Sequence, residues 1–112
     1  MVIALVNHKG GVGKTTCALN IGAGLQRMGK SVLLIDADAQ ANLTLSMGFR
    51  DKEPITLYEA MTEKNTFDEA IIHCKSGLHL IPACLDLCTL ELELSTAFRR
   101  EEILKGLLES LR

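Results

Sequence analysis

Hydrophobic positions along the chain alternate between two patterns, which predict strands and helices in turn. Residues 2–6 and 31–35 are apolar runs rich in Val, Leu and Ile, as is typical of strands buried on both faces of a parallel sheet. From Lys14 to Met28, apolar residues recur at helical spacing, and Gly29 is a suitable C-terminal cap. The order strand, helix, strand predicts a right-handed βαβ unit with parallel strands.

The second half of the chain predicts shorter elements. Residues 37–48 are expected to form a polar loop containing a short helix, and residues 56–61 and 67–72 short helices. Residues 77–81 predict a strand that ends at Pro82.

The C-terminal third is helical by its pattern. Residues 83–94 fit both the alternation of a strand and the spacing of a helix, and we favour the helix. Leucines 104, 107, 108 and 111 have the spacing of an amphipathic helix.

A glycine-rich segment, residues 8–16, joins the first predicted strand to the first predicted helix. This order is typical of a cradle for nucleotide phosphates, because backbone N–H groups converge on the phosphate oxygens and the helix adds the positive end of its dipole. In such a cradle Lys14 neutralises the β and γ phosphates and the Thr15 hydroxyl ligates Mg²⁺. The alternative is a turn that binds nothing, which the agreement of strand, loop, Lys-Thr pair and helix disfavours.

Two carboxylates, Asp36 and Asp38, follow the second predicted strand. The carboxyl ends of parallel strands face the same crevice, so we expect Asp36 to lie near the phosphate loop. A carboxylate pair there can hold the waters of a Mg²⁺ ion and orient an attacking water. The alternative is that both residues only cap a loop, and the upstream phosphate loop favours the functional role.

Composition narrows the class of protein. The 112 residues fit one small domain, with 47% hydrophobic residues and a mean hydropathy of +0.20. Without a long apolar run or a basic N-terminal leader, the sequence predicts a cytoplasmic protein rather than a membrane or secreted one. A net charge of −2 does not predict nucleic-acid binding through bulk electrostatics.

Cysteines and histidines allow a metal site without favouring one. Cys84 and Cys88 are four residues apart without a second close pair, which disfavours zinc or iron–sulfur ligation. His73 and His79 lie in apolar segments, where a structural role is the commoner one. Buried positions in a reducing compartment are expected for all four cysteines, Cys17, Cys74, Cys84 and Cys88.

The loop also departs from the ordinary phosphate-loop pattern, because His8 stands where that pattern has Gly and a second lysine, Lys9, follows. It resembles the deviant Walker A loop, x-Lys-Gly-Gly-x-x-Lys-Ser/Thr, of the ParA/MinD group of ATPases. Residues 36–44 resemble the switch I motif Asp-x-Asp-Pro-Gln-x-Asn-x-Thr of ParA/Soj-type chromosome and plasmid partition ATPases. Gln40, Asn42 and Thr44 match that motif, from which MinD-type members diverge.

The resemblance implies an α/β fold in which a P-loop NTPase-like parallel sheet is flanked by helices, with residues 1–112 as the N-terminal part of a single ATPase domain. It implies that Lys9 reaches across a dimer to the partner's nucleotide, that Asp38 positions the attacking water, and that Asp36 and Thr15 serve the metal. The nucleotide-binding residues it implies are Lys9, Gly10, Gly11, Val12, Gly13, Lys14, Thr15 and Thr16.

The function implied by the resemblance is that of an ATP-hydrolysing dimerisation switch in DNA segregation, with ATP and Mg²⁺ as cofactors. Its partners would be a second copy in an ATP sandwich, a ParB-like stimulator and non-specific DNA, with no membrane. Alternatives are a non-hydrolysing nucleotide-binding assembly module, a MinD-type cell-division regulator, and a relative such as a cobyrinate-type amide synthetase or nitrogenase iron protein.

Two departures from the family pattern have physical consequences. Ala39 replaces the usual Pro, which removes a restraint on φ and predicts a looser switch I. No counterpart of the family's Walker B strand or C-terminal half follows residue 112, so the fold is expected to be incomplete. Residues 2–6 would then lie at an open sheet edge, and the isolated chain is expected to associate or to be marginally stable.

Overall fold

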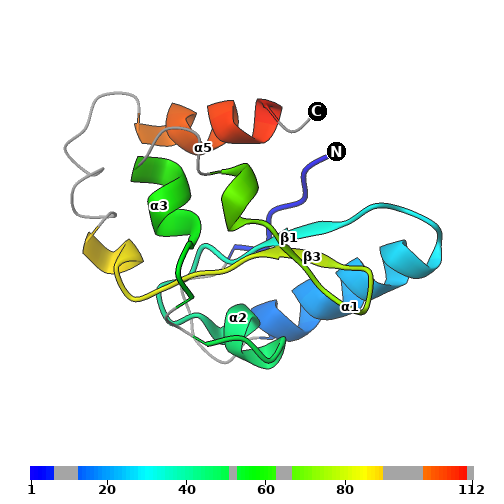
Figure 1. Cartoon of the computed structure of the whole chain (residues 1–112). Helices are drawn as coiled ribbons and strands as arrows, with labels where there is room; N and C mark the ends of the chain where they lie inside the picture. The colour runs from blue at the N-terminus through cyan, green and yellow to red at the C-terminus, as the bar shows by residue number, and fades with distance from the viewer. Residues whose placement is uncertain (7–12, 51–52, 63–66, 90–99, 111–112) are drawn as a thin grey trace.

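The structure is a computed structural model of the chain and describes residues 1–6, 13–50, 53–62, 67–89 and 100–110 (Figure 1). Three strands form one sheet in the order β1-β3-β2. The elements, in chain order, are α1 (Lys14–Arg27), β1 (Leu33–Ile35), α2 (Asn42–Ser46), α3 (Leu57–Thr62), η1 (Asp68–Ala70), β2 (Ile72–His73), β3 (His79–Ile81) and α5 (Arg100–Glu109).

The sheet is mixed. β1 pairs with β3 in parallel, with Leu34 opposite Leu80, and the ladder continues past the strand ends where the Asp36 N–H donates to the Ile81 carbonyl at 3.0 Å. β2 pairs with β3 in the antiparallel sense. The predicted α/β class is confirmed, and the antiparallel β2 is an addition to the parallel arrangement expected from the sequence.

Side chains alternate between the two faces of the sheet, as the period of two in a strand requires. On one face Leu34 and Leu80 pack with Leu43 of α2 and with Ala18 and Leu19 of α1. On the other face Ile81 packs with residues of α3, η1 and α5. The molecule therefore has three layers, with α1 and α2 below the sheet and α3 and α5 above it in Figure 1.

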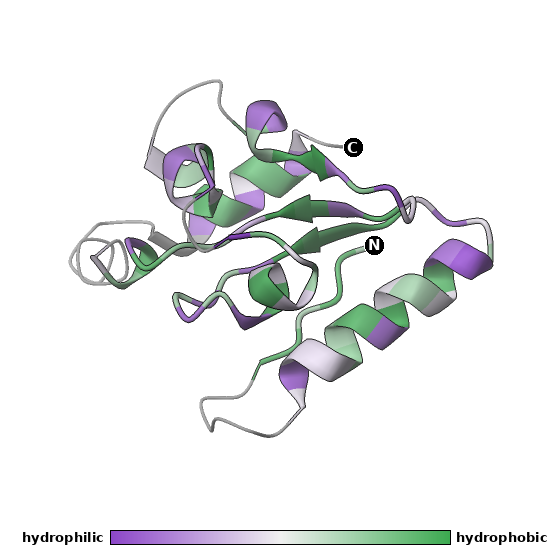
Figure 2. Ribbon diagram, turned by 60° about the horizontal axis from the view of Figure 1, so that its bottom comes forward, coloured by the Kyte–Doolittle hydropathy of each residue, from purple (hydrophilic) through white to green (hydrophobic). Residues whose placement is uncertain are grey.

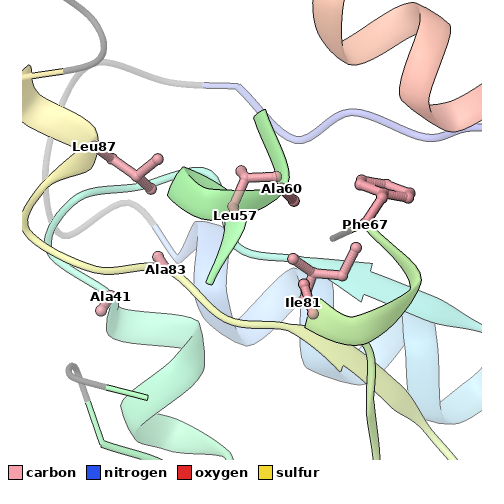
Figure 3. Packing of buried hydrophobic residues seen from close by; sticks show 8 residues of the cluster. Ala41, Leu57, Ala60, Phe67, Ile81, Ala83 and Leu87 are labelled. Carbon is pink, nitrogen blue, oxygen red and sulfur yellow. The ribbon is translucent and has the colours of Figure 1, made fainter. Parts of the chain in front are cut away.

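The larger core cluster fills the space between the sheet and the helices α3 and α5. Figure 3 shows Leu57 and Ala60 of α3 pointing toward this cluster together with Phe67 and Ile81. All four side chains are buried. Its remaining buried members are Ala41, Ala70, Ala83 and Leu87, and the partly buried leucines 104, 107 and 108 of α5 pack against it.

The helices begin and end where the sequence indicates. Gly29 has a φ of +82° just after α1, as expected for a C-terminal cap. At the start of α3, Glu59 accepts a hydrogen bond from the Thr56 N–H at 2.7 Å and a second from the Thr56 hydroxyl, a capping-box arrangement. The helices predicted near residues 14–28, 56–61 and 104–111 are confirmed as α1, α3 and α5, apart from residue 111, which lies outside the described residues.

The strand predicted for residues 2–6 is wrong. These residues are in no strand and are exposed, with Val6 exposed by 86%. A strand persists only when a neighbour takes up its backbone N–H and C=O groups, and this segment does not pair with the described sheet. The segment runs beyond β1, the edge strand of that sheet (Figure 2), so the βαβ unit predicted to start there is not formed.

Three smaller expectations also need correction or limits. Residues 67–72 form a single 3-10 turn followed by β2, because the β-branched Ile72 pairs with β3 instead of continuing the turn. Cys17 and Cys88 are exposed rather than buried, since Cys17 lies on an outward position of α1. Residues 87–89 are helical, whereas 90–94 lie outside the described residues.

Candidate nucleotide-binding site

The start of α1 has the properties of an anion site. Gly13 has a φ of +87°, a left-handed conformation that suits glycine, and the helix begins at the next residue, Lys14. No side chain caps this end, and its first turn contains no acidic residue. The first N–H groups of a helix have no acceptor within the helix, so they and the positive end of its dipole are suited to an anion.

Lys14 lies beside the loop that follows β1. Its Nζ is 3.9 Å from Oδ2 of Asp38, and the two side chains are 34% and 44% exposed. An ion pair this open to solvent contributes little to folding stability, so the approach of these groups matters chiefly for the site. The sequence predicts that Asp36 lies near the phosphate loop, of which residues 8–12 lie outside the described residues, and the contact that the structure shows is the one between Lys14 and Asp38.

Asp36 is the buried centre of the acidic loop. Its side chain is 4% exposed, and both carboxylate oxygens accept hydrogen bonds. Oδ1 accepts from the Asp38 N–H at 3.1 Å, and Oδ2 accepts from the N–H and the hydroxyl of Thr44 at 2.9 and 2.7 Å. A carboxylate has about four lone-pair sites, so these three bonds leave room for one further donor, such as a metal-bound water.

Thr44 joins three elements through one hydroxyl group. It donates to Asp36 at the end of β1 and accepts from the Ala83 N–H, just after β3, at 3.0 Å. Thr44 itself lies in α2 and is fully buried. The carboxyl ends of both parallel strands are thereby held to α2, which fixes the base of the acidic loop.

The tip of the loop is held by its own backbone. The Asp38 carbonyl accepts from the Ala41 N–H at 2.8 Å, and Oδ1 of Asp38 accepts from the Gln40 N–H at 3.0 Å. Ala41 has a φ of +57°, which a side chain with Cβ adopts at some cost, and it is completely buried. These bonds aim Oδ2 of Asp38 toward Lys14, even though Ala39 lacks the restraint of a proline.

The predicted site residues fall into two groups. Of those described, Lys14 and Asp38 are brought together, Gly13 precedes α1, Thr15 is half-buried, and Thr16 is exposed. Asp36 lies under the loop rather than at its surface. Four predicted residues lie outside the described residues: Lys9, Gly10, Gly11 and Val12.

The structural role of Thr44 is not evident from the sequence. Thr44 matches the switch I motif, but the motif alone does not reveal that its hydroxyl returns to Asp36, eight positions earlier, across the start of α2. Periodicity does not register such a contact, because it depends on the turn at Ala41.

The cysteines do not extend the site. Burial raises the pKa of the Cys74 thiol above its ordinary value, which disfavours its thiolate form. All four cysteines are free thiols. In the part of the chain that the structure describes, no group of three or more His, Cys, Asp or Glu residues could hold a metal ion.

The comparison with known families agrees with the geometry. A family model described as an AAA domain, AAA_31, matches residues 1–112. The chain belongs to this AAA domain family. A nucleotide-binding start of α1 is in keeping with that membership.

The chain is similar over nearly its whole length to chromosome-partitioning proteins, as its phosphate-loop and switch I motifs predict. It is 44% identical to the chromosome partitioning protein ParA of Caulobacter vibrioides over 99% of this chain and 42% of ParA. It is 38% identical to the sporulation initiation inhibitor protein Soj of Bacillus subtilis, over 99% of this chain and 45% of Soj.

A solved structure shares the fold of this AAA domain chain. It is cobyrinic acid a,c-diamide synthase of Mycobacterium smegmatis with a bound ATP analogue and magnesium, at a TM-score of 0.88 and 39% identity. The match covers 95% of this chain and 44% of that one. The chain thus spans less than half the length of the relatives it matches.

Proposed function

We propose that this chain is the nucleotide-binding part of a Mg²⁺-dependent ATPase of the ParA/Soj type, acting as a dimerisation switch in chromosome or plasmid partitioning. The observation that carries the proposal is the meeting of Lys14, at an uncapped helix start, with Asp38, at the end of the acidic loop. A cation and backbone donors for phosphate lie on one side of that meeting point, and a carboxylate lies on the other.

The binding step follows from the charges at the start of α1. The γ and β phosphates of ATP would lie against the first N–H groups of the helix, with Lys14 withdrawn from Asp38 to neutralise them. The loop residues Gly10, Gly11 and Val12 would complete the cradle around the phosphates. Because no acidic side chain lies in the first turn of α1, nothing there repels the anion.

The donor set also fits a magnesium ion. Thr15 would hold it through its hydroxyl, and the remaining lone pair of Asp36 would accept from one of its waters. When bound, Mg²⁺ supplies positive charge to the β and γ phosphates. The buried hydrogen bonds of Asp36 keep its carboxylate oriented whether or not nucleotide is bound.

Asp38 and Lys9 would act in the hydrolysis step. Asp38, held by Gln40 and Ala41, would orient the attacking water in line with the leaving oxygen. Lys9 of a second copy would stabilise the negative charge that develops in the transition state, as an arginine finger does. Dimerisation would then depend on the nucleotide, because the lysine of one copy reaches the phosphate of the other.

The partners of the switch belong to the same proposal. A ParB-like protein would stimulate hydrolysis, and the dimer would bind DNA without sequence preference through regions that this chain does not contain. The name of the relative ParA, a chromosome partitioning protein, supports this role.

A phosphate-release assay tests the proposal directly. ATP turnover is measured on this chain and on a version extended to the length of its relatives, each beside the Asp38→Ala variant. We expect Asp38→Ala to keep ATP affinity within about threefold and to lose at least about 100-fold in turnover, because water positioning acts in the transition state alone. Turnover that is unchanged in Asp38→Ala contradicts the assigned role. Binding without turnover in both lengths supports the non-hydrolysing assembly module instead.

A second candidate is favoured by one observation, the similarity to a protein called cobyrinic acid a,c-diamide synthase. In that case ATP would activate a carboxylate for amide formation, and the same phosphate site would serve. Glutamine-dependent ATP consumption in the presence of a corrinoid carboxylate supports this candidate, whereas stimulation by DNA and a ParB-like protein supports the partition ATPase.

A further inference from the structure

A pair of histidines faces across the β2–β3 hairpin, away from the nucleotide site. His73 of β2 is directly opposite His79 of β3 in the antiparallel register. Their Nδ1 atoms are 2.8 Å apart, and the two rings meet edge to face with centroids 4.6 Å apart. His73 is exposed and His79 is half-buried, so solvent and ions reach the pair.

The backbone of the hairpin fixes this approach. The Cys74 N–H donates to the Leu78 carbonyl at 2.9 Å, and the His79 N–H donates the other way, to Val32, at 3.1 Å. His73 and His79 are therefore a non-hydrogen-bonded pair, the kind in which opposite side chains lie closest. The turn is further held to α1 by the Gln26 side chain, which donates to the Ser76 carbonyl at 3.0 Å.

We propose that His73 and His79 form a two-histidine chelate for Cu²⁺ or Ni²⁺, with water in the other coordination positions. Imidazole is a common ligand of both ions. Binding through both Nδ1 atoms needs each neutral ring to carry its proton on Nε2, so the ring that donates in the Nδ1–Nδ1 hydrogen bond changes tautomer as the metal binds. This site is independent of the proposed ATPase function, because His79 lies opposite Leu33 at the start of the parallel strands β1 and β3, whereas Asp36 and Asp38 follow the end of β1.

The spacing of the nitrogens selects among metal ions. With metal–nitrogen distances of about 2.0 Å, nitrogens 2.8 Å apart subtend about 90° at the metal, the angle between neighbouring ligands of a square-planar or octahedral ion. A tetrahedral zinc site would need the nitrogens about 3.3 Å apart. The nitrogen spacing is thus nearer to what Cu²⁺ and Ni²⁺ require than to what tetrahedral Zn²⁺ requires, and the affinity order of the divalent ions also places Cu²⁺ above Zn²⁺.

Cys74, the nearest cysteine in sequence, does not join the pair. It follows His73 in the chain and so points to the opposite face of the strand, where it packs against the cluster around Leu34 and Leu80. Within the described ranges, no third His, Cys, Asp or Glu completes a three-residue metal group. The site is therefore expected to be an exchangeable one.

Calorimetric titration with NiCl₂ tests the chelate on the untagged chain, in a Cys17→Ser/Cys88→Ser background that removes the two exposed thiols. We expect one Ni²⁺ ion to bind with micromolar affinity. His73→Asn and His79→Asn should each weaken binding at least about tenfold, since the second ligand of a chelate acts at high effective concentration. The double variant should bind no more tightly than either single variant, because each single variant still keeps one imidazole ligand.

The chain contains a matched control in its third histidine, His8. His8→Asn should bind Ni²⁺ within about twofold of the parent, and Cu²⁺ bound to the parent should give an electron paramagnetic resonance spectrum with coupling to two nitrogens. The proposal is overturned if the parent binds no Ni²⁺, if either strand variant binds as tightly as the parent, or if His8→Asn loses as much affinity.

Discussion

At the scale of single residues, Thr44 and Asp36 connect the stability of the fold with the shape of the site. The Thr44 hydroxyl donates to the Asp36 carboxylate and accepts from the Ala83 N–H, and all three residues are buried. Buried polar groups of this kind cost free energy when a partner is removed. Asp36 in turn holds the N–H of Asp38, so a change at Thr44 reaches the carboxylate beside Lys14.

Thr44→Val, which keeps the shape and removes the hydroxyl, should lower the free energy of unfolding by about 3 kcal/mol, because the Ala83 N–H loses its acceptor and Asp36 loses a donor. Thr44→Ser should retain most of the stability. Denaturant unfolding followed by circular dichroism measures both changes.

Thr62→Val is the matched control for this substitution. Its hydroxyl donates to the Tyr58 carbonyl at the exposed end of α3, so the change should stay within about 0.5 kcal/mol. A Thr44→Val variant as stable as Thr62→Val would mean that the buried network does not hold the loop.

Site residues that belong to a spaced motif could be predicted from the sequence. Contacts that depend on how the chain turns could not. The sequence predicts that the two carboxylates after residues 31–35 lie near the phosphate loop, and Asp38 does lie beside Lys14. The hydroxyl contact of Thr44 and the left-handed backbone of Ala41 depend on how α2 turns back under the loop. The roles of Lys9, Thr15 and Asp36 toward nucleotide and metal stay predictions.

At the scale of elements, α1 packs closely on β1 at a glycine. Gly22 is the buried residue of α1, and a Cβ built on it would lie 3.0 Å from Cδ2 of Leu34. Gly24, two residues on in the same helix, is exposed, and a Cβ there would meet nothing within 4 Å. Comparing substitutions at Gly22 and Gly24 therefore distinguishes the effect of helix propensity from the effect of packing against β1.

Gly24→Ala should raise the free energy of unfolding by about 0.5–1 kcal/mol, since alanine is the better helix former. Gly22→Ala gains the same propensity but must displace Leu34, so it should be at least about 1 kcal/mol less stable than Gly24→Ala. Thermal or denaturant unfolding of the two variants side by side measures the difference. Equal gains at both positions would show that α1 and β1 are not tightly packed at Gly22.

Elements with a strong period were predicted well, and elements that depend on a neighbour were not. α1, α3 and α5 follow from their own spacing and caps. Residues 2–6 have the composition of a strand, but composition does not say which strand will pair with it. Ile72 likewise entered β2 because β3 lies beside it.

At the scale of the whole molecule, apolar surface is concentrated at the N-terminal segment, where Met1, Val2, Ile3, Leu5 and Val6 are all exposed. The segment runs beyond β1, the edge strand of the described sheet (Figure 2). An exposed apolar segment beside an open strand edge promotes association. Among the described residues no helix is long and apolar enough to cross a membrane.

Sedimentation velocity at rising concentration should therefore detect association of the isolated chain. Ile3→Lys should reduce it, because a charge on the exposed segment disfavours pairing with a second copy. A single monomeric species over the whole range, with a cooperative thermal melt, would contradict this expectation.

The start of α1 is proposed to bind a nucleoside triphosphate through Lys14, and calorimetric titration with ATP and Mg²⁺ measures that binding. The control is Lys30→Ala, which removes an exposed lysine just past the other end of α1. We expect saturable ATP binding by the chain. Lys14→Ala should lose at least about 100-fold in ATP affinity, and Lys30→Ala should not change it. Equal ATP affinity in Lys14→Ala and the unmodified chain would contradict the proposed role of Lys14.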